Sequence, residues 1–217
     1  MVWYLLFAHF LGDFVFQTDW MVRRRDNLWV LSLHAGIHSV LMFLLAGQLR
    51  WVLWPFILLL AMIHLIQDRI KNNLTKRRPD WIRGAFIIDQ VLHYIAIWAV
   101  VSWFDQVRGS FSTPEKPIWV ILAISYLLIT YVWFISERVL NHSNTDYLQS
   151  IHDTKISRML ARAGFVSAFL LLHTLATTGM AFVLSNPYSQ DEFRYRALLT
   201  DISVSISAII FLIWALQ

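Results

Sequence analysis

The sequence LWVLSLHAGIHSVLMFLLAG, residues 28–47, decides the fold class of this chain. Apart from two histidines it carries no ionisable side chain, and its 20 residues match the ~30 Å hydrocarbon core of a bilayer at about 1.5 Å per helical residue. Further apolar runs occupy residues 51–68, 85–104, 117–136, 164–184 and 197–216, and a shorter run, residues 1–17, opens the chain. The sequence therefore predicts an all-α fold, a polytopic transmembrane helical bundle of about seven helices.

The composition supports the same class. Hydrophobic residues make up 58% and charged residues 15% of the 217 residues, and the mean hydropathy is +0.54, a combination that excludes an ordinary soluble domain. The chain has no cysteine, which excludes disulfide bonds and thiolate metal ligands. Basic residues in the loops account for the net charge of +4, so we expect no nucleic-acid partner.

The distribution of basic residues predicts the orientation of the helices. In a seven-helix arrangement thirteen Lys and Arg residues, Arg158 and Arg162 among them, fall on one side of the membrane and five on the other. Because the side richer in Lys and Arg is cytoplasmic, we expect the N-terminus outside and the C-terminus in the cytoplasm. Residues 1–217 are then a single transmembrane domain. Within it, residues 1–104 form a four-helix half and residues 105–217 add three further helices in a supporting role.

Four pairs of histidine and aspartate, with the members four residues apart, occur in the first four apolar segments. One such step on an α-helix is about 400°, so both members of a pair lie on one helix face. In the predicted topology each pair lies a turn or two inside the cytoplasmic end of its helix, which brings all four pairs into one layer of an antiparallel bundle. The pairs are His9/Asp13, His34/His38, His64/Asp68 and Asp89/His93.

These eight side chains predict a metal site within the membrane. An isolated carboxylate at the centre of a bilayer costs at least ~2.5 kcal/mol, and a bound cation would offset that cost. Eight candidate ligands favour two divalent ions, of zinc, manganese or iron, although one ion with additional acid–base groups also fits. The alternatives are a metal-free proton or ion pathway and a purely structural polar network. Against the network, the His34/His38 pair contains no carboxylate and cannot satisfy itself.

Several neighbouring residues are expected to assist this site. Gln17 and Gln90 could orient ligands by hydrogen bonding. Lys71 could neutralise a phosphate or a lipid headgroup, or simply extend to the membrane surface. Gly12 and Gly36 remove side-chain bulk beside the pairs, which would allow close helix approach, although ordinary membrane packing explains them equally well.

The later half of the chain offers weaker signals. We expect residues 137–162 to form a solvated, charged cytoplasmic loop, although the stretch could include an interfacial helix. Asp201 begins the last apolar segment on the outer side, where it would pair with Arg194 or cap the helix. His173 lies alone near the middle of its segment, and we expect a hydrogen-bonded packing role for it.

A set of ordered motifs spans roughly the first hundred residues. The set is similar to that of the bacterial membrane family called domain of unknown function 3307. The resemblance implies an integral protein of the bacterial inner membrane, and it implies no particular reaction because the family name carries no established activity. A looser similarity, in the placement of His and Asp on apolar helices, links the chain to inner-membrane metal-dependent hydrolases. The motifs are His9-Phe-Leu-Gly12-Asp13-Phe14-x2-Gln17-Thr18-Asp19-Trp20, His34-x3-His38, His64-x3-Asp68-x2-Lys71 and Asp89-Gln90-x2-His93.

The pattern favours a metal-dependent hydrolase that acts on a lipid-like or lipid-phosphate substrate at the cytoplasmic leaflet, with Asp13 or Asp68 as general base. One alternative is a divalent-ion or proton transporter or channel. It would need a polar path, yet residues 41–46 and 57–63, in the outer halves of their segments, are wholly apolar. The other alternative is a di-iron oxidase or hydroxylase of acyl chains, although the Glu-x-x-His motif of soluble di-iron bundles is missing. The oligomeric state is left open.

Overall fold

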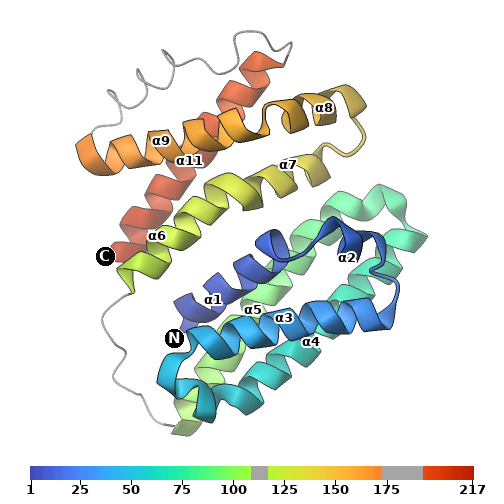
Figure 1. The fold of residues 1–217 in the computed structure, drawn as a ribbon, viewed down its shortest axis with the longest axis vertical. Helices are drawn as coiled ribbons and strands as arrows, with labels where there is room; N and C mark the ends of the chain where they lie inside the picture. Colours follow the sequence, from blue (N-terminus) through green and yellow to red (C-terminus); the bar gives the residue numbers. More distant parts are fainter. Residues whose placement is uncertain (109–116, 173–192) are drawn as a thin grey trace. The chain divides into compact units, whose positions relative to one another are not determined.

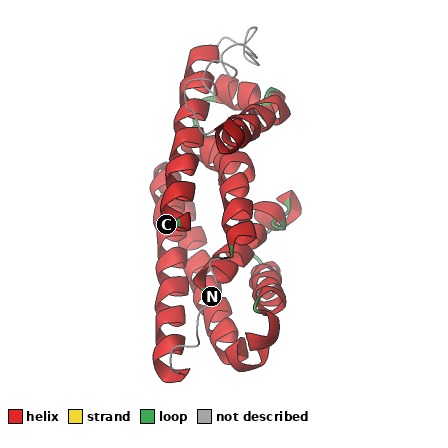
Figure 2. Cartoon of the chain, turned by 90° about the vertical axis from the view of Figure 1, so that its left-hand side faces the viewer, coloured by secondary structure: helices red, strands yellow, loops and turns green. Residues whose placement is uncertain are grey.

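The computed structural model describes residues 1–108, 117–172 and 193–217. Every regular element in these ranges is a helix, as Figure 1 and Figure 2 show. The predicted all-α class is therefore confirmed. The chain divides into two compact units, Met1–Val120 and Ile121–Gln217, and each is described by itself.

The first unit is a bundle of long helices joined by short connections (Figure 1). α3 packs against α4, α4 packs against α5, and α1 packs against both α3 and α5. The elements are α1 (Val2–Phe10), the π-helix η1 (Leu11–Val15), α2 (Asp19–Arg23), α3 (Leu28–Leu45), the 3₁₀-helix η2 (Gly47–Leu49), α4 (Arg50–Arg77), the 3₁₀-helix η3 (Pro79–Trp81) and α5 (Ile82–Arg108).

Local sequence explains where these helices begin and turn. The side chain of Asn27 accepts a hydrogen bond from the backbone N–H of Trp29 (2.9 Å), which caps the start of α3. Gly47 has φ of 59°, a left-handed conformation that favours glycine, at the tight link between α3 and α4. Short links of this kind make successive long helices antiparallel neighbours, so the end of one helix lies beside the start of the next.

Five helices of the described residues are long and apolar enough to cross a membrane. Their outward faces carry large apolar side chains such as Trp29 and Trp51, each 71% exposed, which a water-soluble surface does not tolerate in such numbers. The chain is therefore a membrane protein. The opening apolar helix, Val2–Val15, is shorter than these five, in agreement with the short first run of the sequence. The five spans are Leu28–Leu45, Gly47–Arg77, Pro79–Val107, Ile118–Leu140 and Arg194–Leu216.

The apolar core of the first unit occupies one end of the bundle. On each helix its residues lie to one side of the His/Asp pair: before the pair in α1 and α4, and after it in α3 and α5. Polar side chains therefore gather at the other end. The buried members are Leu5, Ala8, Met42, Ala46, Leu53, Ile57, Leu60, Ile97, Val100, Val101 and Phe104.

The second unit is also helical. α9 packs against η4 and α11. Residues 137–162, predicted to be a solvated loop, instead continue α7, form α8 and begin α9, so that prediction is wrong. The elements are α6 (Ile118–Leu127), which starts just before the boundary of the unit, the π-helix η4 (Leu128–Val132), α7 (Trp133–Leu140), α8 (Thr145–Asp153), α9 (Lys155–Leu172) and α11 (Arg194–Leu216).

A buried ion-pair network corrects the predicted topology of this unit. Asp201 lies within α11, and its Oδ1 is 2.8 Å from Arg158 Nη2 and 2.7 Å from Arg162 Nη1. The expected pairing of Asp201 with Arg194, or its role as a helix cap, is therefore wrong. The seven-helix arrangement placed Asp201 and the two arginines on opposite membrane faces, which these distances rule out. The prediction of a cytoplasmic C-terminus depended on that seven-helix arrangement and is no longer supported by it. His173, for which a packing role was predicted, lies outside the described residues.

Candidate metal centre

All eight paired side chains of the first unit are buried. Their exposed fractions lie between 1% and 9%, although every one of them is a histidine or an aspartate. They come from four helical segments, which are α3, α4, α5 and the continuous segment formed by α1 and η1. Burial of this many ionisable groups is costly unless they are paired or hold a cation. The eight residues are His9, Asp13, His34, His38, His64, Asp68, Asp89 and His93.

Asp13 is the hub of the cluster. Its carboxylate lies among three imidazoles from three helices, and the candidate ligand atoms of this group are all within 4.8 Å of one another. Four ligands held tetrahedrally about 2.0–2.1 Å from a zinc ion are roughly 3.3 Å from one another. The observed separations bracket that value. They are 2.9 Å from Asp13 Oδ1 to His38 Nε2, 3.6 Å from Asp13 Oδ2 to His9 Nε2, and 3.8 Å from Asp13 Oδ1 to His64 Nε2.

The Nε2 atoms of this group are buried without hydrogen-bond partners. This holds for His9, His38 and His64, and also for His93, among the residues that the structure describes. A buried polar atom left unpaired costs about 1–3 kcal/mol, so four in one cluster demand an explanation. His38 Nε2 lies only 2.9 Å from Asp13 Oδ1, a distance that also fits an ion pair when the imidazole is protonated. A metal ion bound by Asp13 and these imidazoles would satisfy the Nε2 atoms of His9, His38 and His64.

The π-helix η1 and Gly12 explain how Asp13 reaches this position. η1 interrupts the helix that begins with α1, and Phe16 N donates to Leu11 O across its wider turn (2.8 Å). Such π-helical turns occur frequently at functional sites. A Cβ atom built on Gly12 would overlap the imidazole ring of His38, whereas one built on Gly36 meets open space. The close approach expected of the glycines is thus found at Gly12 and not at Gly36.

His93 is held in an orientation that suits a ligand. Its Nδ1 donates to the backbone carbonyl of Asp89 at 2.7 Å, which leaves the lone pair on Nε2 free. Histidines that bind metals commonly fix their second nitrogen in this way. The ring of His93 stacks on His9 (centroids 5.0 Å apart) and lies 4.3 Å from the ring of His64.

Asp68, Asp89 and His93 form a second group of converging side chains. Lys71 lies between its two carboxylates, with Nζ 2.8 Å from Asp68 Oδ1 and 2.7 Å from Asp89 Oδ2. Lys71 is therefore part of the cluster and does not extend away to the membrane surface. Its side chain is 21% exposed, more than any of the carboxylates it contacts.

His34 links the two groups. Its Nε2 donates to Asp13 Oδ1 (3.2 Å) and lies 3.6 Å from Asp68 Oδ2, while the amide of Gln17 approaches the same nitrogen at 3.4 Å. The His34/His38 pair thus contacts a carboxylate, Asp13, that belongs to another helix. The lack of a carboxylate within the pair therefore does not by itself indicate a metal. His34 positions Asp13.

Gln90 supports Asp13 from α5. Its Nε2 donates to Asp13 Oδ2 at 3.1 Å, and its Oε1 accepts a hydrogen bond from the Tyr94 hydroxyl at 3.2 Å. Gln90 therefore orients a candidate ligand, as expected. Tyr94 was missed by the sequence analysis, although it follows Gln90 at the same four-residue spacing as the recognised pairs.

The polar end of the bundle carries basic residues beside the cluster. Arg69 donates to the backbone carbonyl of Asp26 (3.0 Å), Asn72 donates to that of Arg25 (3.2 Å), and Lys76 pairs with the Asp26 carboxylate (2.8 Å). These contacts tie the link between α2 and α3 to the end of α4. The partly exposed Lys71 lies on the same stretch of α4, so the accessible edge of the cluster is at this basic end.

A family model described as Protein of unknown function (DUF3307) matches residues 1–122, more than half of the chain. The chain belongs to the DUF3307 family. The matched residues include every member of the buried cluster and correspond closely to the first unit. No curated protein and no solved structure matches the chain.

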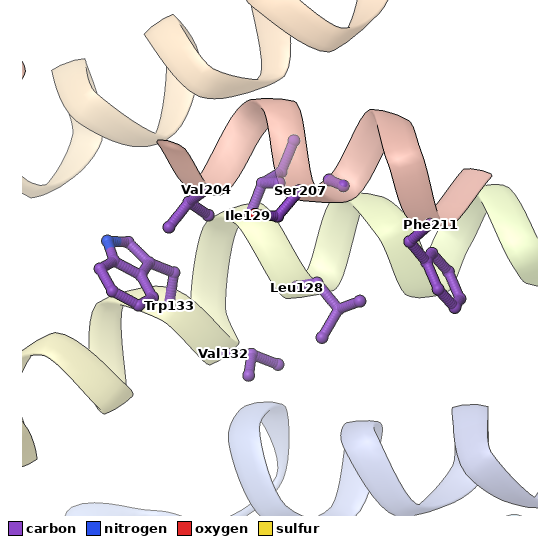
Figure 3. A pocket seen from close by; sticks show the side chains of 8 residues that line it. Leu128, Ile129, Val132, Trp133, Val204, Ser207 and Phe211 are labelled. Carbon is purple, nitrogen blue, oxygen red and sulfur yellow. The ribbon is translucent and has the colours of Figure 1, made fainter. Parts of the chain in front are cut away.

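Apolar grooves also lie among the described residues, and two of them bear on the site. One, of about 280 Å³, lies between α3 and α4 within the DUF3307 region, and Ser39 in its lining directly follows His38. The other, of about 340 Å³, lies outside that region, between the π-helix η4 and α11 (Figure 3). Its lining comprises Leu128, Ile129, Val132, Trp133, Val204, Ser207, Ala208 and Phe211, which provides no set of catalytic side chains. Of these features, the buried His/Asp cluster is the one that provides candidate catalytic side chains.

Proposed function

We propose that this protein is an integral-membrane, metal-dependent hydrolase of the bacterial inner membrane, acting on a lipid-like or lipid-phosphate substrate at the cytoplasmic leaflet. The observation that carries the proposal is the convergence of buried, unpartnered Nε2 atoms of His9, His38 and His64 on the Asp13 carboxylate. Nitrogen and oxygen ligands of this kind suit zinc, manganese or iron.

The side chains divide into ligands and reaction groups. His9, Asp13, His38 and His64 would hold the ion, which would polarise the scissile ester or phosphate and increase the nucleophilicity of water. Asp68 is the better candidate for general base, because Asp13 is occupied by the imidazoles around it. Asp68 Oδ2 lies 3.4 Å from His64 Nε2, next to the ligand set.

The proposed reaction needs only water as a second reactant. Water gives a proton to the Asp68 carboxylate while its oxygen bonds to the phosphorus or carbonyl carbon of the substrate. The bond from that atom to the leaving alcohol oxygen breaks, and Asp68 returns the proton to the alcohol. Gln90 and His34 keep Asp13 in place through hydrogen bonds of 3.1 and 3.2 Å.

The surroundings favour an amphiphilic substrate. One end of the bundle is an apolar core, and the accessible edge of the cluster lies at the basic end, near Arg69 and Lys76. A phosphate-bearing headgroup is attracted to such a basic end, while its acyl chains stay in the bilayer. Among the described residues of the first unit, the apolar core leaves the cluster without a polar continuation, which favours a reaction site over a transport path.

Elemental analysis tests the metal centre directly. Wild-type protein purified in detergent and dialysed against zinc or manganese should retain stoichiometric metal and hydrolyse a phospholipid or polyprenyl phosphate. His64→Ala should lose both properties. His152→Ala is the matched control, because His152 is 72% exposed and lies in α8 of the second unit.

Three outcomes would count against the proposal. Equal metal content in wild type and His64→Ala would exclude this ligand set. Metal binding without hydrolysis, combined with metal-dependent proton or ion flux into vesicles, would favour the transport alternative. Oxygen consumption by an iron-loaded protein in the presence of acyl chains would favour the oxidase alternative.

A further inference from the structure

We infer that the Lys71 ammonium takes the place of a second metal ion, so that the centre holds one divalent ion and not two. The inference rests on the proposed metal centre and specifies its composition. It concerns the second group of converging side chains, Asp68, Asp89 and His93.

The position of Lys71 carries the inference. The ligand atoms of Asp68, Asp89 and His93 lie within 4.8 Å of one another, which is the arrangement that a second ion would require. Lys71 Nζ already contacts one oxygen of each carboxylate, at 2.8 and 2.7 Å. An ion placed between these oxygens would overlap the ammonium group, because metal–oxygen bonds are about 2.0–2.2 Å long.

The charge of the cluster leads to the same conclusion. Three buried carboxylates, Asp13, Asp68 and Asp89, carry three negative charges, and Lys71 supplies one positive charge. The sum of minus two is cancelled by one divalent ion when the imidazoles are neutral. A second divalent ion would leave an excess of two positive charges in surroundings of low dielectric constant, where unbalanced charge is strongly unfavourable.

Lys71 also has a donor left for the substrate. An ammonium group has three N–H donors, and Asp68 and Asp89 accept two of them. The side chain is 21% exposed at the accessible edge of the cluster. The third N–H can therefore bind an anionic oxygen of a phosphate or carboxylic ester. Lys71 would then both neutralise the carboxylates and bind the substrate.

The test is the number of metal ions per chain, measured with manganese or zinc on full-length protein in detergent. Wild type should bind one ion. Lys71→Met removes the cation but adds no ligand, so the freed carboxylates should take up a second ion and raise the count to two. In manganese-loaded Lys71→Met the two ions should also be spin-coupled, which electron paramagnetic resonance detects.

Two controls define the second position. Lys76→Met changes a lysine that pairs with Asp26 at the surface, with a side chain 56% exposed, and should keep the count at one. Adding Asp89→Asn to Lys71→Met removes one carboxylate of the second group and should return the count to one. Circular dichroism verifies that each variant is helical.

The outcomes separate this inference from the proposed function. Two ions in wild type would overturn the inference and leave the metal centre intact. A count that stays at one in helical Lys71→Met would also overturn it. No metal in wild type would overturn both proposals. If Lys71→Met fails to fold, the ion counts of wild type and Asp89→Asn still test whether Asp89 is a metal ligand. If it is not, both proteins should bind one ion. A lower count in Asp89→Asn than in wild type would overturn the inference.

Discussion

Both units bury a cluster of ionisable side chains between helices, and the two clusters differ in how completely their groups are paired. In the second unit Arg158 uses Nε and Nη2 to bind both oxygens of Asp201 (2.9 and 2.8 Å), and Nη2 also donates to Glu137 (2.9 Å). Arg162 donates to Asp201 (2.7 Å) and to the carbonyl of Ile129. Two positive and two negative charges balance, and no buried side-chain nitrogen or oxygen of these four charged residues lacks a partner.

The first unit has the opposite character. Its three carboxylates exceed its one lysine by two charges, and four imidazole Nε2 atoms have no hydrogen-bond partner. A closed network such as that of the second unit is complete without a ligand, and removal of any one partner leaves a buried charge unpaired. An open cluster of converging acceptors is complete only when a cation joins it. Burial of charge alone therefore does not indicate a functional site, and the candidate site is chosen on the convergence of side chains without hydrogen-bond partners.

A π-helix lies at each cluster, with a different use. In η1 the wider turn carries the side chain of Asp13 into the cluster. In η4 it is the backbone that takes part, because the carbonyl of Ile129 accepts from buried Arg162. Outside the membrane spans, in α8, burial and the Glu137 carboxylate raise the pKa of Tyr147, so its phenol stays protonated and donates to Glu137 (2.6 Å). The second cluster is thus closed by neutral donors as well as by ion pairs.

The largest effect is expected from breaking the closed network. Asp201→Ala leaves Arg158 and Arg162 without their shared carboxylate, and removal of one partner from a buried pair typically costs about 3–5 kcal/mol. We expect a loss of that size in the free energy of unfolding, measured by denaturant titration in micelles. Asp153→Ala, at a side chain 61% exposed in α8, is the control. A loss below about 1 kcal/mol would mean that the network is not closed as described.

The next largest effect is expected from filling the open cluster. A ligand that binds only the folded state stabilises it by about 3–4 kcal/mol at 100 to 1,000 times its dissociation constant. Zinc or manganese should therefore raise the melting temperature of wild type, and a chelator should reverse the change. His38→Ala should show little response, whereas His152→Ala should respond like wild type. Equal metal-induced increases in the melting temperature of all three proteins would show that the first cluster does not bind the metal through His38.

Gly12→Ala sharpens the geometry of the open cluster. The added methyl group overlaps the His38 ring, and overpacking of this kind costs about 1–3 kcal/mol. We expect lower thermal stability together with weaker metal binding, measured by calorimetric titration. Gly36→Ala is the matched control in α3, since its Cβ would meet open space and alanine favours helix. Identical behaviour of the two variants would show that His38 does not need its observed position.

The smallest effect is expected from Tyr94→Phe. The change removes one hydrogen bond to Gln90, worth about 0.5–1.5 kcal/mol, and loosens the amide that holds Asp13. Metal affinity should fall severalfold while the number of ions per chain stays constant. Tyr195→Phe, at a side chain 67% exposed in α11, should leave the affinity unchanged. A change in the number of ions would mean that Gln90 or Tyr94 is itself a ligand.

The convergence of the four pairs in the first unit could be predicted from the sequence because the signals for it are local. The four-residue spacing of pairs such as His64/Asp68 puts both side chains on one face, and short links make successive helices antiparallel. Together they bring the pairs together without knowledge of the packing. The sequence analysis failed for the second unit because the partners there are far apart in sequence. Asp201 and Arg158 are 43 residues apart, and each taken alone resembles an ordinary interfacial charge.

The sequence by itself determined that the chain is helical and membrane-embedded and that each pair lies on one helix face, because hydropathy and helical periodicity are properties of neighbouring residues. Only the tertiary structure decided that Asp13 is the hub, that Gly12 makes room for His38, and that Lys71 lies between two carboxylates. These features depend on the rotation and spacing of helices against one another. Many different rotations leave the same residues on the same buried face, so local periodicity cannot choose among them.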